Sequence, residues 1–263
     1  MVEPLNLRNL AWVLTTMLEI ILLFYLLWRR FYRTHPAFFI YVSAAIVQSV
    51  TLACAYRYWG AQSMQAWNIG WGGQAAIICA RWCAVAEIAR KILGNYGGIR
   101  RMSSLILFVL GICVLVYSIA SSENGWTLIV LHADRAVELC IGVFIVFLFV
   151  FAGYYRLPIM SQEKLLGVGF CLYSCFSVIN DSIYENSLST LGGLWNYLDI
   201  LIFLATLLLW FGAARMPAEP QKVAAEIPLT PEVYGELSQK LDSRLHLLNH
   251  RLNHLLRSEG SKP

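Results

Sequence analysis

Of the 263 residues in the chain, 58% are hydrophobic and only 14% are charged, and the mean hydropathy of +0.59 is too high for an ordinary soluble domain. The formal net charge of +4 comes from short basic connections between apolar runs and gives no ground for a nucleic-acid partner. The seven cysteines are dispersed through apolar runs, which excludes a disulfide framework and leaves an integral membrane protein as the expected class.

Seven apolar runs follow one another along the chain, each long enough to cross about 30 Å of hydrocarbon as a helix. No basic segment precedes the first run and two arginines follow it, so we expect an uncleaved span there and not a signal peptide. The sequence therefore predicts an all-α, polytopic bundle of seven transmembrane helices within residues 1–215. The runs cover residues 10–28, 38–58, 66–92, 103–120, 126–153, 164–184 and 194–214.

Basic residues are confined to alternate connections between these runs. The second, fourth and sixth connections contain no Lys or Arg. Because basic connections stay in the cytoplasm, we expect the N-terminus outside, the C-terminus inside, and the chain in the bacterial inner membrane with the lipid bilayer as its surroundings. The basic connections carry Arg29, Arg30, Arg33, Arg90, Lys91, Arg100, Arg101, Arg156 and Lys164.

Polar residues inside the first three spans are expected to face the interior of the bundle. The first span carries Glu19 about halfway across, and the third carries Gln74 and Arg81 on one face. Arg81 lies too deep to reach the interface, so it needs an acidic partner from another helix. Arg57 in the second span either extends to the outer interface or turns inward.

The third span also carries two features with structural interpretations. Arg90 and Lys91 follow Glu87 by three and four residues, which predicts a local ion pair at the cytoplasmic end. Gly70, with Gly72 and Gly73, lets another helix backbone approach closely, as small residues do in membrane proteins. The fourth span is almost wholly apolar and is expected to be the most lipid-exposed.

The fifth run contains four ionisable residues, His132, Asp134, Arg135 and Glu138. The last three fall within roughly a third of the helix circumference, and His132 borders them. Facing lipid near mid-bilayer would cost about 2.5 to 3.5 kcal/mol for each charge. We therefore expect this face to look into protein or a water-filled cavity, with Arg135 as its central positive charge.

The sixth and seventh spans add four polar residues toward their outer ends: Asn180, Asp181, Asn196 and Asp199. After them, residues 216–230 are rich in Pro and predict a linker. A helix is expected over 231–258, followed by a tail at 259–263. Its leucines repeat in the a/d rhythm of a coiled coil, which predicts a cytoplasmic helix that pairs two protomers or contacts a signalling partner. They are Leu241, Leu245, Leu248, Leu252 and Leu255.

The sequence lacks residues that several classes of membrane protein need. No Lys lies deep in the seventh span for a retinal Schiff base, and His132 is the only histidine deep in a span, which excludes a bis-histidine haem and a multi-histidine zinc site. No span has an interior Pro, which disfavours a broken-helix transporter. For the cysteine pairs 79/83 and 171/175, apolar packing is favoured over a metal or redox site. No metal and no cofactor is expected.

Acidic residues outnumber basic ones inside the spans. Even with Arg57 turned inward, three arginines face five carboxyls, so two carboxyls lack a basic partner. A proton or a cation satisfies such a group. We therefore expect a sensor with an outward-facing, net acidic pocket for a small cationic or proton-linked signal. Its candidate binding residues are Glu19, Gln74, Arg81, His132, Asp134, Arg135, Glu138, Asn180, Asp181, Asn196 and Asp199.

Three other interpretations stay open. The same carboxyls could serve a proton or cation channel or carrier, which a flux assay would distinguish from a sensor. The chain could be a membrane enzyme acting on a lipid-like substrate, although no catalytic residue is identified and no nucleophile or metal motif supports this. The polar groups could also be purely structural, selecting one packing of the bundle.

Two basic motifs carry a resemblance to other proteins. Trp28-Arg29-Arg30-Phe31-Tyr32-Arg33 follows the first span, and Glu87-Ile88-Ala89-Arg90 closes the third, before Arg100-Arg101. In these motifs the chain resembles uncharacterised bacterial seven-helix integral membrane proteins. The resemblance extends over much of the membrane region and implies an architecture without an activity.

Overall fold

The computed structural model describes residues 7–60, 62–94, 97–122, 125–155, 157, 159–186 and 192–217. Side chains of residues 7–12, 180–186, 192–197 and 199 are outside this description. Apart from residues 216 and 217, the predicted linker, cytoplasmic helix and tail also lie outside the described residues.

The described part of the chain consists of helices and contains no strand, so the prediction of an all-α fold is confirmed. Each predicted apolar run coincides with one long helix, and a short 3-10 helix η1 (Phe31–Arg33) follows the first. The long helices are α1 (Leu7–Trp28), α2 (Pro36–Trp59), α3 (Met64–Ile92), α4 (Gly97–Ser121), α5 (Trp126–Tyr154), α6 (Ser161–Asn186) and α7 (Gly192–Arg215).

Three of the helical segments are long and apolar enough to cross a membrane, and two more are apolar but shorter. Within the described residues the three are Pro36–Trp59, Gly98–Ser121 and Trp126–Tyr154, and the shorter two are Val13–Trp28 and Ile200–Arg215. The length and apolarity of these helices are those expected of a membrane protein.

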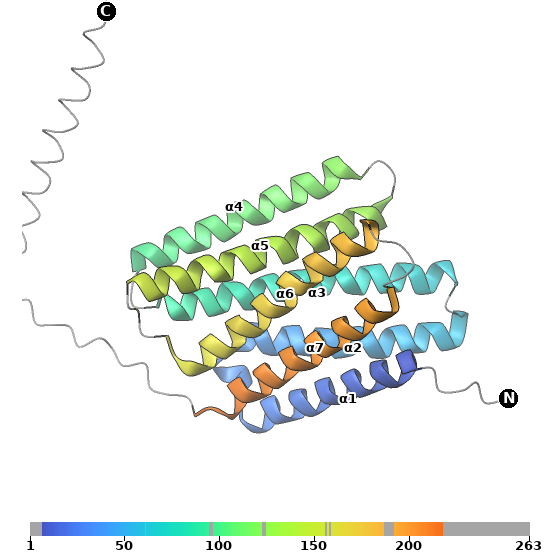
Figure 1. Ribbon diagram of the computed structural model, residues 1–263, viewed down its shortest axis with the longest axis horizontal. Coiled ribbons are helices and arrows are strands. Elements are labelled where there is room, and N and C mark those ends of the chain that lie inside the picture. The colour runs from blue at the N-terminus through green and yellow to red at the C-terminus, as the bar shows by residue number, and fades with distance from the viewer. Residues whose placement is uncertain are drawn as a thin grey trace, which may run out of the picture. The chain divides into compact units, whose positions relative to one another are not determined.

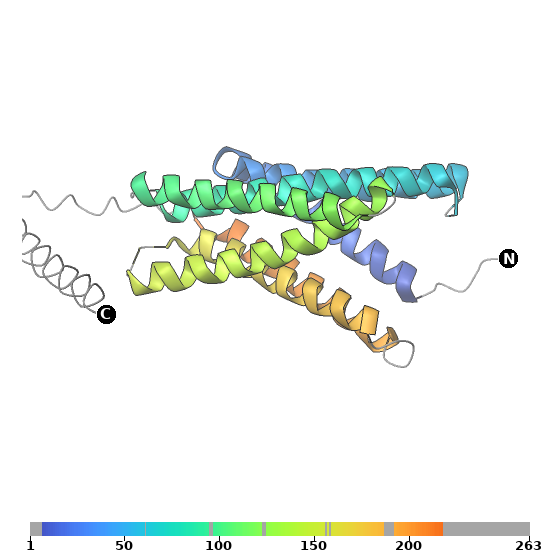
Figure 2. The same ribbon diagram turned by 90° about the horizontal axis from the view of Figure 1, so that it is seen from above.

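Consecutive helices run in opposite directions, so their ends gather at two ends of the bundle (Figure 1). The C-terminal ends of α1, α3, α5 and α7 lie at one end, which we call the basic end because it carries Arg29, Arg33, Arg90, Arg100 and Arg101. In Figure 2, α2, α3 and α4 form one layer, α6 and α7 lie in a second, and α5 runs obliquely between them. Helix α3 packs against α2, α4, α5 and α6 and is the centre of the arrangement.

Glycines allow helices to approach closely at two places. A Cβ on Gly73 of α3 would lie 2.8 Å from Cγ of Gln48 on α2, so this glycine makes room for a side chain and not, as predicted, for a helix backbone, and Gly72 has open space around it. A Cβ on Gly169 of α6 would lie 2.5 Å from Nε1 of Trp210 on α7. The Trp210 ring is buried, with its centroid 5.1 Å from that of Phe170 and 5.4 Å from that of Phe38. These three rings and Tyr41 form an aromatic cluster toward the basic end of the bundle.

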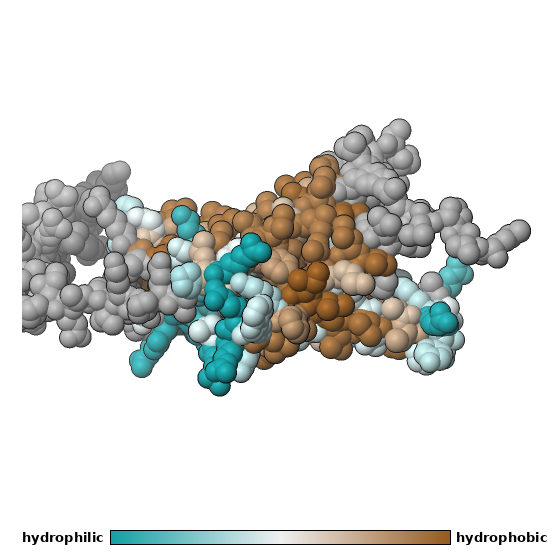
Figure 3. Space-filling view, turned by 90° about the horizontal axis from the view of Figure 1, so that it is seen from below, coloured by the Kyte–Doolittle hydropathy of each residue, from teal (hydrophilic) through white to brown (hydrophobic). Residues whose placement is uncertain are grey.

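The surface between the two ends is apolar. Figure 3 shows a broad hydrophobic region with hydrophilic residues beside it at both ends. Large apolar side chains of α4, among them Leu105, Phe108 and Val116, are exposed. A soluble monomer rarely exposes so large a contiguous apolar surface, whereas contact with lipid accounts for it.

Candidate functional site

The candidate site is centred on Arg81 of α3, which is only 3% exposed. Its Nη1 forms an ion pair with Oε1 of Glu138 on α5. The same nitrogen lies 3.9 Å from Oδ1 of Asp134, one turn along α5. The prediction that Arg81 has an acidic partner from another helix is therefore confirmed, and two carboxylates share that role.

Two tyrosine rings enclose the Arg81 guanidinium group from other helices. Its Cζ lies 5.6 Å from the ring centroid of Tyr41 on α2 and 4.9 Å from that of Tyr173 on α6. Desolvated cation–π contacts of this kind contribute up to about 2 kcal/mol each. Four helices, α2, α3, α5 and α6, thus meet around one positive charge.

Hydrogen bonds extend the site in both directions from the ion pair. Ser174 Oγ of α6 donates to Oε2 of Glu138. Gln74 Nε2 of α3 donates to Oδ2 of Asp134 at 2.9 Å. Gln48 Nε2 of α2 donates to the Gly70 carbonyl oxygen at 3.3 Å, and at 3.5 Å to Oε1 of Gln74. Each of the two carboxylates therefore has the guanidinium group as a charged neighbour and one neutral hydrogen-bond donor, while Oδ1 of Asp134 has no hydrogen-bond partner among the described residues.

The two carboxylates differ in their access to solvent. The side chain of Glu138 is 3% exposed, whereas that of Asp134 is 27% exposed. Asp134 is also four residues closer to the start of α5, at the end opposite to the basic end. Asp134 is therefore the more accessible of the two carboxylates, and Glu138 is the more enclosed one.

The structure brings together Gln74, Arg81, Asp134 and Glu138 of the predicted site residues. For Asp134 and Glu138 the central cation is Arg81 and not, as predicted, Arg135, which is partly buried and interacts electrostatically with Asp134. The other outer acids, Asp181 and Asp199, have side chains outside the description, so for them the role of Arg135 stays a prediction. Helix α5 turns positions 134 and 138 toward α3, and position 135 lies about 100° from 134 and about 60° from 138.

The other predicted residues lie around this centre or outside the described side chains. The ring of His132 packs against Tyr117 of α4, with centroids 6.4 Å apart. Glu19 of α1 is half-buried and interacts electrostatically with Tyr41. Arg57 is exposed, so of its two predicted placements the inward one is wrong. The side chains that are not described are those of Asn180, Asp181, Asn196 and Asp199.

Glu87 has a different role from the predicted local ion pair. Its Oε2 accepts hydrogen bonds from the backbone N–H groups of Ala37 at 2.9 Å and Phe38 at 3.1 Å, in the first turn of α2. The first N–H groups of a helix have no partner within the helix and carry its positive dipole end. Lys91 in turn donates to the carbonyl oxygen of Thr34. The predicted local interaction is therefore present only as an electrostatic interaction of Glu87 with Lys91, and the hydrogen-bond partner of Glu87 is the N-terminus of α2.

A second buried acidic contact lies near the Glu87 cap. His35 Nε2 is 3.5 Å from Oε1 of Glu163 on α6, and both residues are buried. The His35 ring stacks on Phe31 with centroids 4.4 Å apart. Sequence reasoning missed this pair because a single histidine before Pro36 and a glutamate in the first turn of α6 carry no pattern that connects them.

The geometry limits the chemistry of the site. Among the described residues, no three His, Cys, Asp or Glu side chains are grouped to hold a metal ion. The sulfur atoms of Cys171 and Cys175 are 3.9 Å apart, and all seven cysteines are free. Since a helical bundle by itself assigns no activity, the function has to be argued from the polar network. No protein-family model, no curated protein and no solved structure matches this chain.

Proposed function

We propose that the chain is an inner-membrane protein whose seven helices all cross the bilayer, with the N-terminus outside and the basic end in the cytoplasm. The apolar surface between two polar ends supports insertion (Figure 3). The alternating direction of the helices supports the topology, because it collects the predicted cytoplasmic connections at a single end (Figure 1).

We further propose that the network around Arg81 senses a proton or small cation that reaches Asp134 from outside. The observation that carries this proposal is the arrangement of one guanidinium group between two carboxylates of unequal exposure. Neutralising or occupying Asp134 would remove one of the two acidic contacts that hold α3 to α5, while Glu138 keeps Arg81 in place. A change at Asp134 would thus alter the packing of α3 without unfolding the bundle.

A sensor is favoured over a channel because an aromatic cluster lies between the Arg81 network and the polar groups of Glu87, His35 and Glu163 toward the basic end. Beyond Arg81 lies the aromatic cluster of Phe38, Tyr41, Phe170 and Trp210, with Phe38 0% and Trp210 2% exposed. Ions and water need polar groups to cross such a layer. The count of charges is also compatible with ligand binding. Among the described side chains in and around the Arg81 network, the two cations Arg81 and Arg135 face three carboxyls, those of Glu19, Asp134 and Glu138.

Melting of the purified full chain in detergent tests the sensor. Candidate cations such as Na⁺ and methylammonium should raise the Tm of the wild type, by the equivalent of about 2.7 kcal/mol at a hundredfold excess over Kd. Asp134→Asn keeps the shape of the side chain and should abolish this rise. Glu87→Gln, which alters a carboxylate outside the network, should retain it. A wild-type Tm that does not respond to any cation or to pH would refute the proposal.

Flux measurements separate the sensor from a channel or carrier. Liposomes containing the protein should show no more proton or Na⁺ movement than empty liposomes. Movement that Asp134→Asn abolishes would establish transport through the same carboxyl group and would replace the sensor by a channel or carrier.

Cysteine labelling tests the topology. On a cysteine-free background, Gln62→Cys between α2 and α3 should react with an impermeant maleimide on intact cells, and Tyr155→Cys after α5 should react only after permeabilisation. Both positions are exposed. Ser103 is unsuitable as the internal position because it is buried and would not react on either side. The reverse pattern would invert the proposed orientation.

A further inference from the structure

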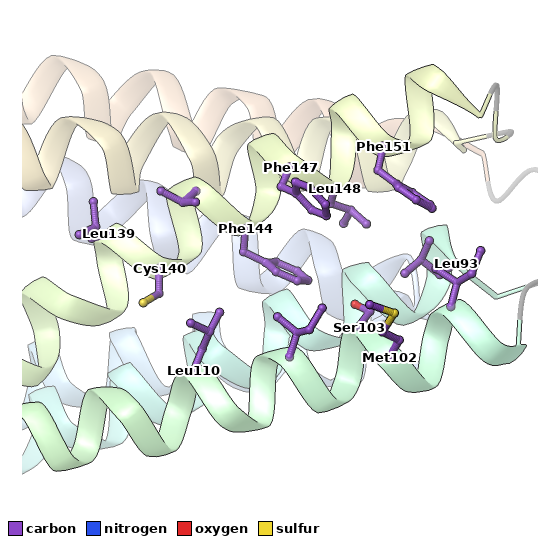
Figure 4. A pocket seen from close by; sticks show the side chains of 13 residues that line it. Leu93, Met102, Ser103, Leu110, Leu139, Cys140, Phe144, Phe147, Leu148 and Phe151 are labelled. Carbon is purple, nitrogen blue, oxygen red and sulfur yellow. The ribbon is translucent and has the colours of Figure 1, made fainter. Parts of the chain in front are cut away.

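An apolar groove that the proposed sensor does not use lies between α4 and α5. Its volume is about 540 Å³, within the range of about 300–1,000 Å³ that small-molecule sites occupy. Figure 4 shows the side chains of Phe144 and Phe147 on α5 directed toward α4, with Met102 and Leu110 on the opposite wall. Leu93, the residue directly after α3, lies at the basic end of the groove. The walls are almost wholly apolar, so the part of an occupant that fills the groove is apolar.

The length of the groove matches one leaflet of a bilayer. Its lining on α4 extends from Ile99 to Leu110, eleven positions, which is about 16 Å at about 1.5 Å per residue. On α5 it extends from Phe151 to Leu139, twelve positions or about 18 Å. Half of a hydrocarbon core is about 15 Å thick. The groove therefore reaches from the basic end to mid-bilayer, as an extended acyl chain does.

One buried polar group lies in the groove near its basic end. Ser103 is 8% exposed, lines the groove, and its hydroxyl has no hydrogen-bond partner among the described residues. A buried hydroxyl without a partner is unfavourable. A ligand that brings a hydrogen-bond acceptor to this depth would satisfy it.

Positive charge is concentrated just beyond Ser103. Arg100 and Arg101 are exposed in the first turn of α4, at the positive end of the helix dipole. Basic side chains are unfavourable there unless an anion is bound, because a helix N-terminus itself attracts anions. Arg100 lies three residues, or about 4.5 Å, closer to the end of the helix than Ser103. By helix periodicity it is about 100° around the helix from Ile99 of the groove, whereas Arg101 is about 200° away.

From mid-bilayer toward the basic end, the apolar groove, Ser103 and Arg100 follow one another in the same order as the acyl chain, ester group and phosphate of a phospholipid. A phosphate lies at the membrane surface, ester carbonyl groups lie below it, and acyl chains fill the hydrocarbon. We propose that the groove binds one acyl chain of an anionic phospholipid, with its phosphate at Arg100 and an ester carbonyl accepting a hydrogen bond from Ser103. This site rests on the proposed membrane insertion but not on cation sensing at Asp134.

Native mass spectrometry of the full chain in detergent tests the proposal, with dioleoyl phosphatidylglycerol and dioleoyl phosphatidylcholine as probes. The wild type should retain one phosphatidylglycerol at a lipid concentration about fivefold lower than it needs for phosphatidylcholine, the effect of about one basic side chain. Leu110→Trp fills the inner part of the groove and should weaken retention of both lipids by about tenfold or more. Leu105→Trp is the matched control, because this α4 side chain is 61% exposed and faces away from the groove.

The head-group contacts have their own matched pair. Arg100→Gln should remove the preference for phosphatidylglycerol and leave phosphatidylcholine retention unchanged, whereas Arg101→Gln should keep most of the preference. Ser103→Ala should weaken both lipids by about three- to tenfold, because both carry the ester group. Arg100 is exposed, so its variant keeps the proposal testable even if Leu110→Trp does not fold.

Three results would overturn the lipid site. The first is equal retention of the two lipids by the wild type. The second is lipid retention by a folded Leu110→Trp variant that equals that of the wild type. The third is a dimer of the delipidated protein that Leu110→Trp dissociates, which would show that a second copy of the chain occupies the groove. The measurement contains no cation ligand. Failure of the lipid site would therefore leave the cation response intact, and failure of the sensor would leave lipid retention intact.

Discussion

Replacement of Arg81 by methionine is the most informative change in the polar network. Methionine is of similar length and removes only the charge and the donors, so the aromatic contacts with Tyr41 and Tyr173 are partly kept. Glu138 then stays buried without a cation, and Asp134 loses its nearest one. Breaking a buried pair by removing one partner costs about 3 to 5 kcal/mol. Because Asp134 is partly exposed and can take up a proton from water, we expect the lower half of this range.

A double-mutant cycle separates the pair from the rest of the network. Glu138→Gln alone should destabilise by a similar amount, because it leaves Arg81 buried with only Asp134. The double variant Arg81→Met, Glu138→Gln removes both charges and should be more stable than the sum of the single effects predicts, by about 1 to 3 kcal/mol. Unfolding in mixed micelles, followed by tryptophan fluorescence, gives the free energy of each variant.

The control for this cycle is Arg57→Met. Arg57 is an exposed arginine on α2, so its replacement removes the same charge without breaking a buried pair. Its free energy of unfolding should stay within about 0.5 kcal/mol of the wild type. Two results would show that the ion pair does not hold α3 to α5 and would remove the basis of the sensor mechanism. One is an Arg81→Met variant with the free energy of unfolding of the wild type. The other is a double variant whose loss of free energy equals the sum of the losses in Arg81→Met and Glu138→Gln.

Two further changes test the packing around the network. Gly169→Ala should destabilise the bundle by about 1 to 3 kcal/mol, because its Cβ would lie 2.5 Å from Nε1 of the buried Trp210. Gly72→Ala is the control, because the space around its Cβ is open, and it should not lower the Tm. Equal melting of the two variants would contradict this packing. Glu87→Gln should cost about 0.5 to 2 kcal/mol, because the charge that caps α2 is lost. Hydrogen exchange should then increase at the amides of Ala37 and Phe38, and unchanged exchange there would show that the cap does not stabilise α2.

The positions of the helices were predictable because the physical cause is local. Each span needs about twenty apolar residues, and such a run can form only a helix if its backbone groups are to be satisfied in lipid. Predicted and observed limits differ by only a few residues. Among the starts, α2 begins at Pro36 instead of residue 38, with Pro in the first helical position, and α4 at Gly97 instead of residue 103, because Arg100 and Arg101 continue the helix beyond its apolar run.

The membership of the site was predictable in part, and its pairing was not. Charge inside an apolar run must face the interior, which selects Arg81, Asp134 and Glu138. Which acid meets which arginine depends on the rotation of α5 and on its position beside α3, and neither leaves a trace in the residue spacing. Tyr41 and Tyr173 were missed for a related reason: a tyrosine in an apolar run looks the same whether it contacts lipid or a cation.

The contacts of α3 suggest how a change at one end of the bundle would reach the other. On α3, Gln74 donates a hydrogen bond to Asp134, Arg81 pairs with Glu138, and Glu87 caps the N-terminus of α2. A single helix therefore contacts the more accessible carboxylate, Asp134, and also stabilises the start of α2. A helix moves along its axis as a nearly rigid body, since its backbone bonds resist compression more than its side-chain contacts resist sliding. Loss of the Asp134 contacts would therefore shift the Glu87 cap, which lies about 20 Å from Gln74 along α3 at about 1.5 Å per residue. That cap lies beside α1, η1 and the start of α2, at the basic end where the proposed topology places the cytoplasm.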